Sequence, residues 1–244
     1  MKRTAIAIAT MIAVIALVPL GSAQESRPEG KAEQTNQRRG GGGPGPVDAG
    51  TDLSKPLLPK DDGEKKILEA LDQARQGRRY ANVSTADGRL LRQLTEAINA
   101  KRVVELGTST GESGLWFAMA LRKTGGHLYT HDIDPGRISV ARENFKKGGV
   151  ENLITIVEGD AHQTATKNAE PIDVLFIDAE KEGYDAYLKE LLPLVRPGGL
   201  ILAHNMRRPA PNPRYVEAIT TNPDLDTSFV LMDGAGLGIT LKKR

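Results

Sequence analysis

Three polar residues follow two apolar runs, and together they predict one chemical site. Asp178 directly follows the run 174–177, and His204 and Asn205 follow the run 200–203. If the two runs are neighbouring parallel strands, their carboxyl ends meet at one edge of a sheet and the three side chains converge. Carboxylate, imidazole and amide groups suit a divalent cation with open positions for water or substrate. The sequence therefore predicts a metal site at Asp178, His204 and Asn205.

A glycine-rich turn lies further upstream, between an apolar run and a helical pattern. Residues 103–106 are apolar except for Glu105, and Gly107 and Gly111 follow them. Glycine lets the backbone turn tightly and approach a ligand, and the next helix presents unpaired N–H groups. The spacing is not G-x-G-x-x-G, because Ser109 stands at the second glycine, and no lysine follows as in a P-loop. We therefore predict a pocket for a nucleotide-type cofactor without pyrophosphate, in which Glu105 accepts hydrogen bonds from a ligand amine or hydroxyl.

A second acid, Asp132, ends the next apolar-rich run, 128–132. An acid one strand beyond the glycine turn is suited to accept the two hydroxyls of a ribose. A tight turn followed by a solvated acid is the alternative interpretation, because several cofactor classes share this pair of features. The other motifs in the chain favour the cofactor.

Five short motifs together resemble the S-adenosylmethionine-dependent O-methyltransferases, specifically the metal-dependent branch that contains catechol and caffeoyl-CoA O-methyltransferases. They occur in the family's order and spacing between residues 81 and 243, and the combination is more specific than any single motif. The matching segments are VELG at 104–107 with Gly111 and Ser113, HDID at 131–134, EGDA at 158–161, FIDAEK at 176–181 and AHN at 203–205.

The resemblance implies that S-adenosylmethionine binds at the carboxyl ends of the strands. The Gly-Asp-Ala segment would then lie along the adenine, with the Ala161 amide or the adjacent His162 nearest the ring. A plain turn at the end of a strand is the alternative role of Gly159 and Asp160. The loop that closes over the methionine end would offer Ser84, for which a helix N-cap is the alternative role. The implied cofactor-binding residues are Ser84, Glu105, Gly107, Gly111, Ser113, Asp132, Ala161 and Asp178.

Lys181, three residues after Asp178, coincides with the family's catalytic lysine. Methyl transfer from a sulfonium is an in-line displacement that needs an oxygen nucleophile without its proton. A cation that binds the acceptor hydroxyls lowers their pKa, and a nearby lysine can then take the proton. A solvated lysine in the charged run 179–182 is the alternative, and the resemblance favours the catalytic role.

His204 departs from the family pattern, in which the three metal-binding positions are Asp, Asp and Asn. Imidazole in place of a carboxylate removes one negative charge and shifts the preference from Mg towards Mn, Fe, Co or Zn. Two alternatives follow from this departure: a metal-independent methyltransferase with His204 as the catalytic base, or a protein that binds the cofactor without turnover. A nicotinamide oxidoreductase is disfavoured by the glycine spacing.

Alternating strands and helices provide the elements that position these residues. Apolar strands separated by helices predict a parallel sheet that is covered on both faces. The fold class is therefore α/β: a Rossmann-like class I methyltransferase with a mostly parallel seven-stranded sheet, an antiparallel C-terminal hairpin and helices on both faces. Residues 80–88 predict a loop before a helix at 89–100. Further strands are predicted at 154–158, 174–177 and 200–203, and the hairpin at 228–232 and 238–242.

We place the methyltransferase domain at 61–244, after two segments of different composition. Residues 1–23 have the basic start, apolar core and small final residues of a secretory signal peptide, which predicts cleavage after Ala23. A leader that stays uncleaved and anchors the protein in a membrane is the alternative. Residues 24–60 are polar and rich in Gly and Pro, which predicts a disordered linker. We expect an exported protein, periplasmic or secreted, although S-adenosylmethionine is made in the cytoplasm.

Composition limits the partners of this protein. The 33 Lys and Arg residues are balanced by 31 Asp and Glu residues, and no basic block is interleaved with aromatics, so nothing indicates nucleic-acid binding. Without cysteine the chain has no disulfide, thiolate ligand or cysteine nucleophile. We predict methyl transfer to a hydroxyl of a small, catechol-like molecule. A homodimer is suggested by the resemblance, and a membrane tether only if the leader remains.

Overall fold

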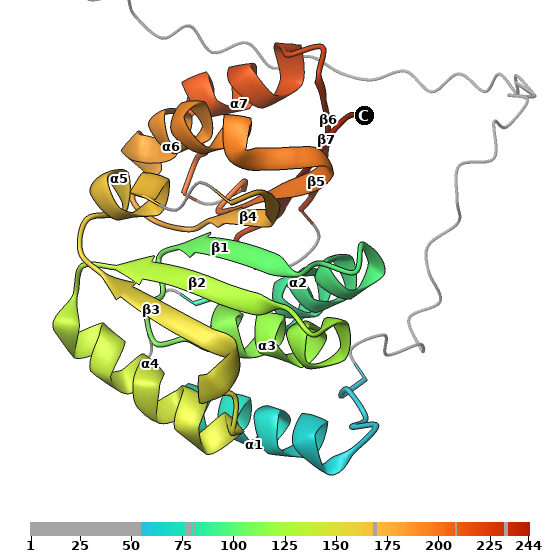
Figure 1. Cartoon of the computed structure of the whole chain (residues 1–244), viewed down its shortest axis with the longest axis vertical. Helices are drawn as coiled ribbons and strands as arrows, with labels where there is room; N and C mark the ends of the chain where they lie inside the picture. The colour runs from blue at the N-terminus through green and yellow to red at the C-terminus, as the bar shows by residue number, and fades with distance from the viewer. Residues whose placement is uncertain (1–54, 77–79, 81, 168–169, 208, 232–233) are drawn as a thin grey trace, which may run out of the picture. The chain divides into compact units, whose positions relative to one another are not determined.

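Seven strands form one mixed sheet in the order β3-β2-β1-β4-β5-β7-β6 (Figure 1). Neighbours from β3 to β5 pair in parallel, while β7 runs antiparallel to both β5 and β6. The chain order reverses beside β1, where a parallel sheet opens a crevice at its carboxyl edge. The predicted fold class is confirmed. The strands are β1 (Arg102–Leu106), β2 (His127–Asp132), β3 (Ile154–Glu158), β4 (Ile172–Ile177), β5 (Val195–His204), β6 (Leu225–Val230) and β7 (Leu237–Lys242).

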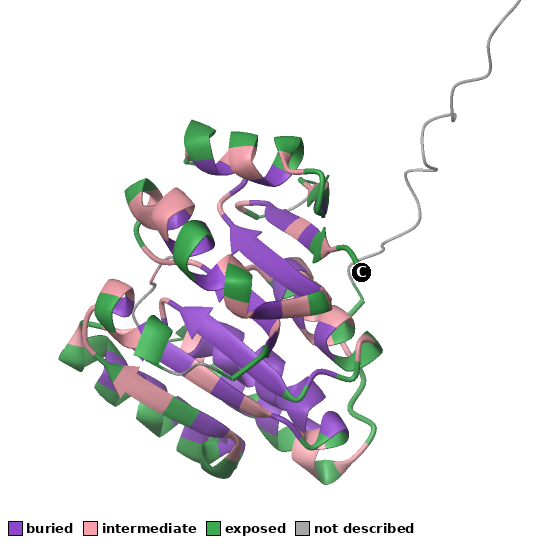
Figure 2. Cartoon of the chain, turned by 45° about the horizontal axis from the view of Figure 1, so that its top comes forward, coloured by how far each residue is buried: buried purple, intermediate pink, exposed green. Residues whose placement is uncertain are grey.

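Helices cover both faces of the sheet, with α1 to α4 on one face and α5 to α7 on the other (Figure 1). Successive side chains of a strand point to opposite faces. In β4, Phe176 therefore joins the core under α1 to α4, and Ile177 joins the core under α5 to α7. Figure 2 shows the central strands buried between helices whose outer sides are exposed. The helices are α1 (Asp62–Gln76), α2 (Thr85–Ala97), α3 (Glu112–Thr124), α4 (Pro135–Gly148), α5 (Ala161–Thr164), α6 (Tyr184–Leu191) and α7 (Pro213–Thr221).

Helix α2 begins four residues earlier than the sequence predicts. The segment 80–88 is rich in turn-forming residues and predicts a loop, but α2 starts at Thr85. Ser84 caps this helix, because its Oγ accepts a hydrogen bond from the Asp87 backbone N–H at 3.1 Å. Gly88 lies inside the helix, and a Cβ there would stand 2.1 Å from Trp116 Nε1. The glycine is therefore needed for close packing of α2 on α3, and does not mark a turn.

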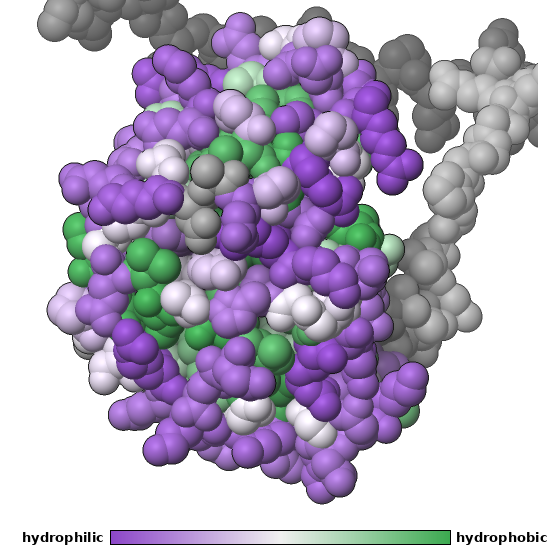
Figure 3. Space-filling model, viewed as in Figure 1, coloured by the Kyte–Doolittle hydropathy of each residue, from purple (hydrophilic) through white to green (hydrophobic). Residues whose placement is uncertain are grey.

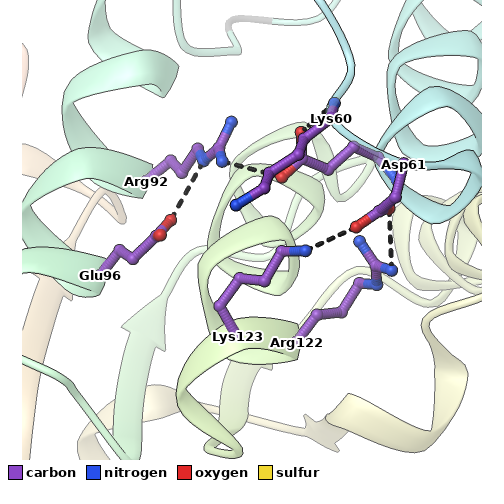
Figure 4. Close-up of polar contacts among 7 residues, drawn as sticks. Lys60, Asp61, Arg92, Glu96, Arg122 and Lys123 are labelled. Carbon is purple, nitrogen blue, oxygen red and sulfur yellow. Dashed lines mark hydrogen bonds and ion pairs between the residues drawn. The ribbon is translucent and has the colours of Figure 1, made fainter.

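Ion pairs fix the start of α1 against α2 and α3 (Figure 4). The Asp61 carboxylate accepts hydrogen bonds from Lys123 Nζ at 2.5 Å and from Arg122 Nη2 at 3.1 Å. One turn later, Glu64 pairs with Arg92 at 2.9 Å, and the Glu64 side chain is only 1% exposed. Loss of one partner of a buried pair is costly, because the other charge then stays buried and unpaired.

The structure describes residues 55–76, 80, 82–167, 170–207, 209–231 and 234–244. The predicted signal peptide and most of the predicted linker lie outside these residues. Residues Pro56–Arg244 group together as one unit of the chain. Within the described part of the chain, no helix has both the length and the apolar character needed to cross a bilayer. The surface seen in Figure 3 is mostly hydrophilic, with smaller apolar areas between polar groups.

Candidate active site

A cavity of about 770 Å³ lies at the carboxyl ends of the parallel strands. This volume is typical of a small-molecule site. Each of the five parallel strands contributes a predicted site residue from its end or from the residues just after it. These residues are Gly107, Asp132, Ala161, Asp178 and Asn205. The structure thus brings together residues that are up to 98 positions apart in the sequence (205 − 107).

The glycine turn forms one wall of this cavity. Gly107 has φ +102°, and a Cβ on it would stand 2.3 Å from the carbonyl oxygen of Asp178. Ser109 also has a positive φ, and its backbone N–H donates to Asp132 Oδ2 at 2.7 Å. The other oxygen, Oδ1, accepts from the Asp134 backbone N–H at 2.9 Å. Asp132 therefore holds the turn against the end of β2 and keeps its own carboxylate fixed at the cavity wall.

Glu105 and Ser113 lie behind the turn and do not line the cavity. The Glu105 carboxylate is fully buried and accepts hydrogen bonds from Ser113 Oγ and, at 2.5 Å, from Thr130 Oγ1. Burial raises the pKa of Glu105 to about 8, helped by the nearby Asp178 and Asp132 carboxylates and opposed by the two hydroxyl donors. The side chains of Glu105 and Ser113 thus support the turn from inside, and a direct contact with the cofactor stays a prediction.

The other two predicted cofactor residues, Gly111 and Ser84, also lie outside the main cavity. Gly111 precedes α3 with φ +84°, and a Cβ there would meet the Phe145 ring at 2.6 Å. Ser84 lines a separate hollow of about 320 Å³, which it shares with Tyr80 and Glu112. Gly111 therefore shapes the start of α3. The capping role of Ser84 is observed, whereas its contact with the cofactor stays a prediction.

Lys181 lies at the cavity wall beside Asp178. Its ammonium donates to Asp178 Oδ1 at 3.1 Å, to the Ala179 carbonyl at 3.0 Å and to the Tyr184 hydroxyl at 2.7 Å. Burial, with a smaller contribution from the Asp178 charge, raises the pKa of Tyr184 far above its usual value, so this phenol stays protonated. Three acceptors therefore fix the position of Lys181, and they direct its amine towards the end of β4.

His204 lies between two carboxylates and is 2% exposed. Nε2 is 3.3 Å from Asp87 Oδ2, and Nδ1 is 3.2 Å from Asp178 Oδ2. The contact with Asp178 lacks hydrogen-bond alignment, and Nδ1 has no hydrogen-bond partner. Burial alone would lower the pKa of His204, but the Asp178 and Asp87 carboxylates outweigh it and raise this pKa to about 9. Sequence reasoning misses Asp87, because its surroundings in the sequence indicate only the start of a helix.

The donor set at His204 fits a divalent cation. Nδ1 is a buried nitrogen that lacks a hydrogen bond, and its distance from Asp178 Oδ2 suits two atoms that bind the same ion side by side. Asn205 follows at the cavity wall and can add an amide oxygen. A metal ligand must give up its proton, so a cation would displace the proton from Nδ1. Among the residues that the structure describes, no three His, Cys, Asp or Glu side chains are grouped as a metal site, so the metal is a proposal.

Comparison with known proteins identifies the family. The chain matches the family described as "O-methyltransferase" over residues 60–208. It is 35% identical to a catechol O-methyltransferase of Mycobacterium tuberculosis, over 68% of this chain and 74% of that protein. It is 38% identical to a catechol O-methyltransferase of Niastella koreensis, over 55% of this chain and 62% of that protein. The chain thus spans less than two thirds of the second relative.

Solved structures agree with this assignment. An O-methyltransferase from Bacillus cereus in complex with SAH has 26% identity and a TM-score of 0.64, over 77% of this chain and 93% of that one. Cofactor-bound Rv0187 from MTB has 30% identity and a TM-score of 0.65, with the same coverage. The match of the family extends over more than half of the sequence. This chain therefore belongs to the O-methyltransferase family.

Proposed function

We propose that this protein transfers a methyl group from S-adenosylmethionine to a hydroxyl of a small, catechol-like acceptor. The observation that carries the proposal is the position of Lys181, which lines the same cavity as the glycine turn and Asp132. The family and the SAH-bound Bacillus cereus structure support the cofactor. The acceptor class is supported by two relatives that are named catechol O-methyltransferases.

The cavity offers separate surfaces for the ribose and for the adenine of the cofactor. The fixed Asp132 carboxylate can accept the ribose hydroxyls, and the backbone of the glycine turn permits close approach. Both His162 and Tyr187 line the cavity, and the His162 ring stacks on Tyr187 with 4.0 Å between ring centroids. His162 follows Ala161 directly, so a flat aromatic surface lies next to the Ala161 amide, where we propose that the adenine binds.

In the proposed reaction, the acceptor oxygen attacks the methyl carbon while the bond from that carbon to sulfur breaks. The products are a methyl ether and S-adenosylhomocysteine, and the hydroxyl proton passes to the Lys181 amine. Asp178 and Tyr184 hold the Lys181 nitrogen in place, at 3.1 and 2.7 Å, which positions it for the base role. Lys181 takes the hydroxyl proton from its neutral form, because an ammonium has no site that accepts a proton. His204 suits the base role less well, because it is 2% exposed and does not line the cavity.

We also propose that Asp178, His204 and Asn205 hold a divalent cation. When bound, such an ion lowers the pKa of the acceptor hydroxyl and orients the acceptor. The imidazole ligand favours Mn, Fe, Co or Zn over Mg. Asp178 would then serve two groups, since one of its oxygens faces Lys181 and the other faces His204.

The experiment that tests the function uses protein that begins at Gln24, stripped with a chelator. Methyl transfer from labelled S-adenosylmethionine to a panel of catechols is measured without metal and after addition of Mg, Mn, Fe, Co or Zn. We expect turnover that returns with metal, and the metal dependence will show what His204 selects. Turnover that the chelator leaves unchanged would contradict the proposed metal and support a metal-independent methyltransferase, in which variants of Lys181 and His204 decide which of the two is the base.

Two further outcomes separate the remaining alternatives. Binding of S-adenosylhomocysteine without any methyl transfer, also with a wider set of acceptors, would favour a protein that only binds the cofactor. A thermal shift with NAD but not with S-adenosylhomocysteine would contradict the methyltransferase altogether and indicate a nicotinamide enzyme. We expect stabilisation by S-adenosylhomocysteine alone, because ligands that bind the folded state raise its melting temperature.

A further inference from the structure

We propose that Asp87 is a positioning residue for the metal site and acts through His204. The inference rests on the metal site that is part of the proposed function. Asp87 lies on α2, 117 residues before His204 in the sequence, and does not line the cavity. Neither the family motifs nor the residue spacing assigns it a role. Its position in the structure does.

The contact between the two side chains fixes which nitrogen of His204 faces the metal site. Asp87 Oδ2 lies 3.3 Å from His204 Nε2, and both side chains are about 2 to 3% exposed. An ionised carboxylate only accepts hydrogen bonds, so Nε2 carries the hydrogen in this contact. Nδ1 is then the nitrogen that can bind a cation, and it faces Asp178 Oδ2 at 3.2 Å.

A carboxylate is one of the common partners of the second ring nitrogen in a metal-binding histidine. It holds the ring in one orientation and makes the other nitrogen a stronger donor. The negative charge of Asp87 also restores part of what the site loses when imidazole replaces a carboxylate. Asp87 therefore compensates in two ways for the presence of His204, by geometry and by charge.

Neighbouring residues fix the position of Asp87. Its backbone N–H donates to the capping Ser84, which sets the first turn of α2. A Cβ on Gly234, which has φ +62°, would stand 2.6 Å from Asp87 Oδ2 and 2.9 Å from Ser84 Oγ. Because it has no side chain, Gly234 can lie close to the carboxylate. Three parts of the chain therefore meet at Asp87: the start of α2, the end of β5 and Gly234.

The test compares the affinity of wild type and Asp87→Asn for Mn²⁺, measured by calorimetry on the full chain after chelation. We expect Asp87→Asn to weaken Mn²⁺ binding about 10- to 100-fold, the usual effect of removing such a partner. The affinity for S-adenosylhomocysteine should stay unchanged, because Asp87 does not line the cavity. If Asp87→Asn does not fold, Asp87→Ser replaces it with the same expectation.

Glu64→Gln is the matched control. Glu64 occupies the same position in α1 that Asp87 occupies in α2, the third residue of the helix, and is equally buried. Its partner is Arg92 on α2, which does not line the cavity. This variant should lower the melting temperature and leave Mn²⁺ binding unchanged. Equal losses of Mn²⁺ affinity in Glu64→Gln and Asp87→Asn would reduce Asp87 to a purely structural role and overturn the proposal.

A double-mutant cycle tests whether Asp87 acts through His204. In a His204→Asn background, Asp87→Asn should cause no further loss of Mn²⁺ affinity, since the ring that Asp87 orients is absent. A loss as large as in the wild-type background would overturn the proposal. The visible absorption of bound Co²⁺ should also change in Asp87→Asn. If wild type binds neither Mn²⁺ nor Co²⁺, the inference fails, whereas methyl transfer in the presence of chelator would leave the proposed reaction standing.

Discussion

At the scale of single residues, the site is a row of alternating charges that crosses the ends of two strands. Asp87 faces His204, His204 faces Asp178, and Asp178 faces Lys181, with separations of 3.3, 3.2 and 3.1 Å. Each buried charge has an opposite charge beside it, which offsets the cost of removing it from water. Substitution of one of these residues therefore changes the electrostatic surroundings of the next. The effects of single substitutions on stability and binding should not be additive here.

The first prediction concerns Lys181. Lys181→Met should lower kcat about 100- to 10,000-fold, because it removes the group that accepts the hydroxyl proton. The affinity for S-adenosylhomocysteine should stay within the error of the measurement, since the glycine turn and Asp132 are unchanged. Lys181→Arg is the control: it keeps a positive charge beside Asp178 but cannot act as a base at neutral pH. Substantial turnover by Lys181→Arg would assign Lys181 an electrostatic role instead.

The second prediction concerns the pH dependence of stability at Glu105. Burial raises the pKa of this carboxyl from 4.5 to about 8. Between these values the folded state binds a proton that the unfolded state has lost, so the free energy of unfolding falls as pH rises. The slope is at most about 1.4 kcal/mol per pH unit. Glu105→Gln cannot ionise and should lack this component.

The measurement is urea denaturation of both proteins from pH 4.5 to pH 8. Other groups also titrate in this range: burial lowers the pKa of His131 to about 4, and carboxylates raise that of His204 to about 9. Their contributions are common to both proteins, so the difference between wild type and Glu105→Gln isolates Glu105. A difference that does not vary with pH would show that the folded protein admits water to this carboxyl.

At the scale of elements, the start of α2 raises the question whether Ser84 only caps the helix or also contacts the cofactor. Ser84→Ala should lower the free energy of unfolding by about 1 kcal/mol, because the Asp87 backbone N–H loses its acceptor. The affinity for S-adenosylhomocysteine should not change if capping is the only role. Ser84→Asp, another good cap, should restore the stability. Weaker cofactor binding by both variants, measured by calorimetry, would instead support the contact that the family resemblance implies.

The strands show which elements the sequence can predict. Runs such as 174–177 are buried on both faces, so their apolar character marks them clearly, and the polar residue that ends each run lies at the sheet edge. The start of α2 escapes prediction, because Ser84, Asp87 and Gly88 are typical of both turns and helix caps. Only packing decides between them: Gly88 has to make room for Trp116.

In the candidate site too, the sequence predicts some residues and misses others that are distant in the chain. The strand ends bring Asp178, His204 and Asn205 together by a general rule of parallel sheets, and this much can be predicted from the sequence. Asp87 comes from a helix on one face of the sheet, and nothing local links it to a residue 117 positions later. Such a contact depends on how α2 packs, which a single sequence does not encode in any short pattern.

At the scale of the whole molecule, we propose different roles for the methyltransferase domain and for the residues before it. We propose that residues 1–23 direct export and that residues 24–60 separate the leader from the domain. Sequencing of the exported protein should find Gln24 at the N-terminus. A start at Met1 would instead support a leader that is retained as a membrane anchor. A homodimer is likewise a proposal, which the molecular mass in solution will test.

The last prediction asks where the folded unit begins. Protein that starts at Pro56 should melt at the same temperature as protein that starts at Gln24, because Pro56–Arg244 group together as one unit of the chain. Protein that starts at Gly63 should melt at a lower temperature. It lacks Asp61, whose carboxylate accepts from Lys123, Arg122 and the Glu64 backbone N–H.

Asp61→Ala in the protein that starts at Pro56 tests whether the melting temperature falls because the Asp61 side chain is lost or because the chain is shorter. If it reproduces the lower melting temperature, the contacts of Asp61 with α1 and α3 define the start of the domain. If the protein that starts at Gly63 melts like the others, the ion pairs of Asp61 with Arg122 and Lys123 in Figure 4 add nothing measurable, as is common for exposed ion pairs. The buried Glu64 with Arg92 would then be the first contact that the domain needs.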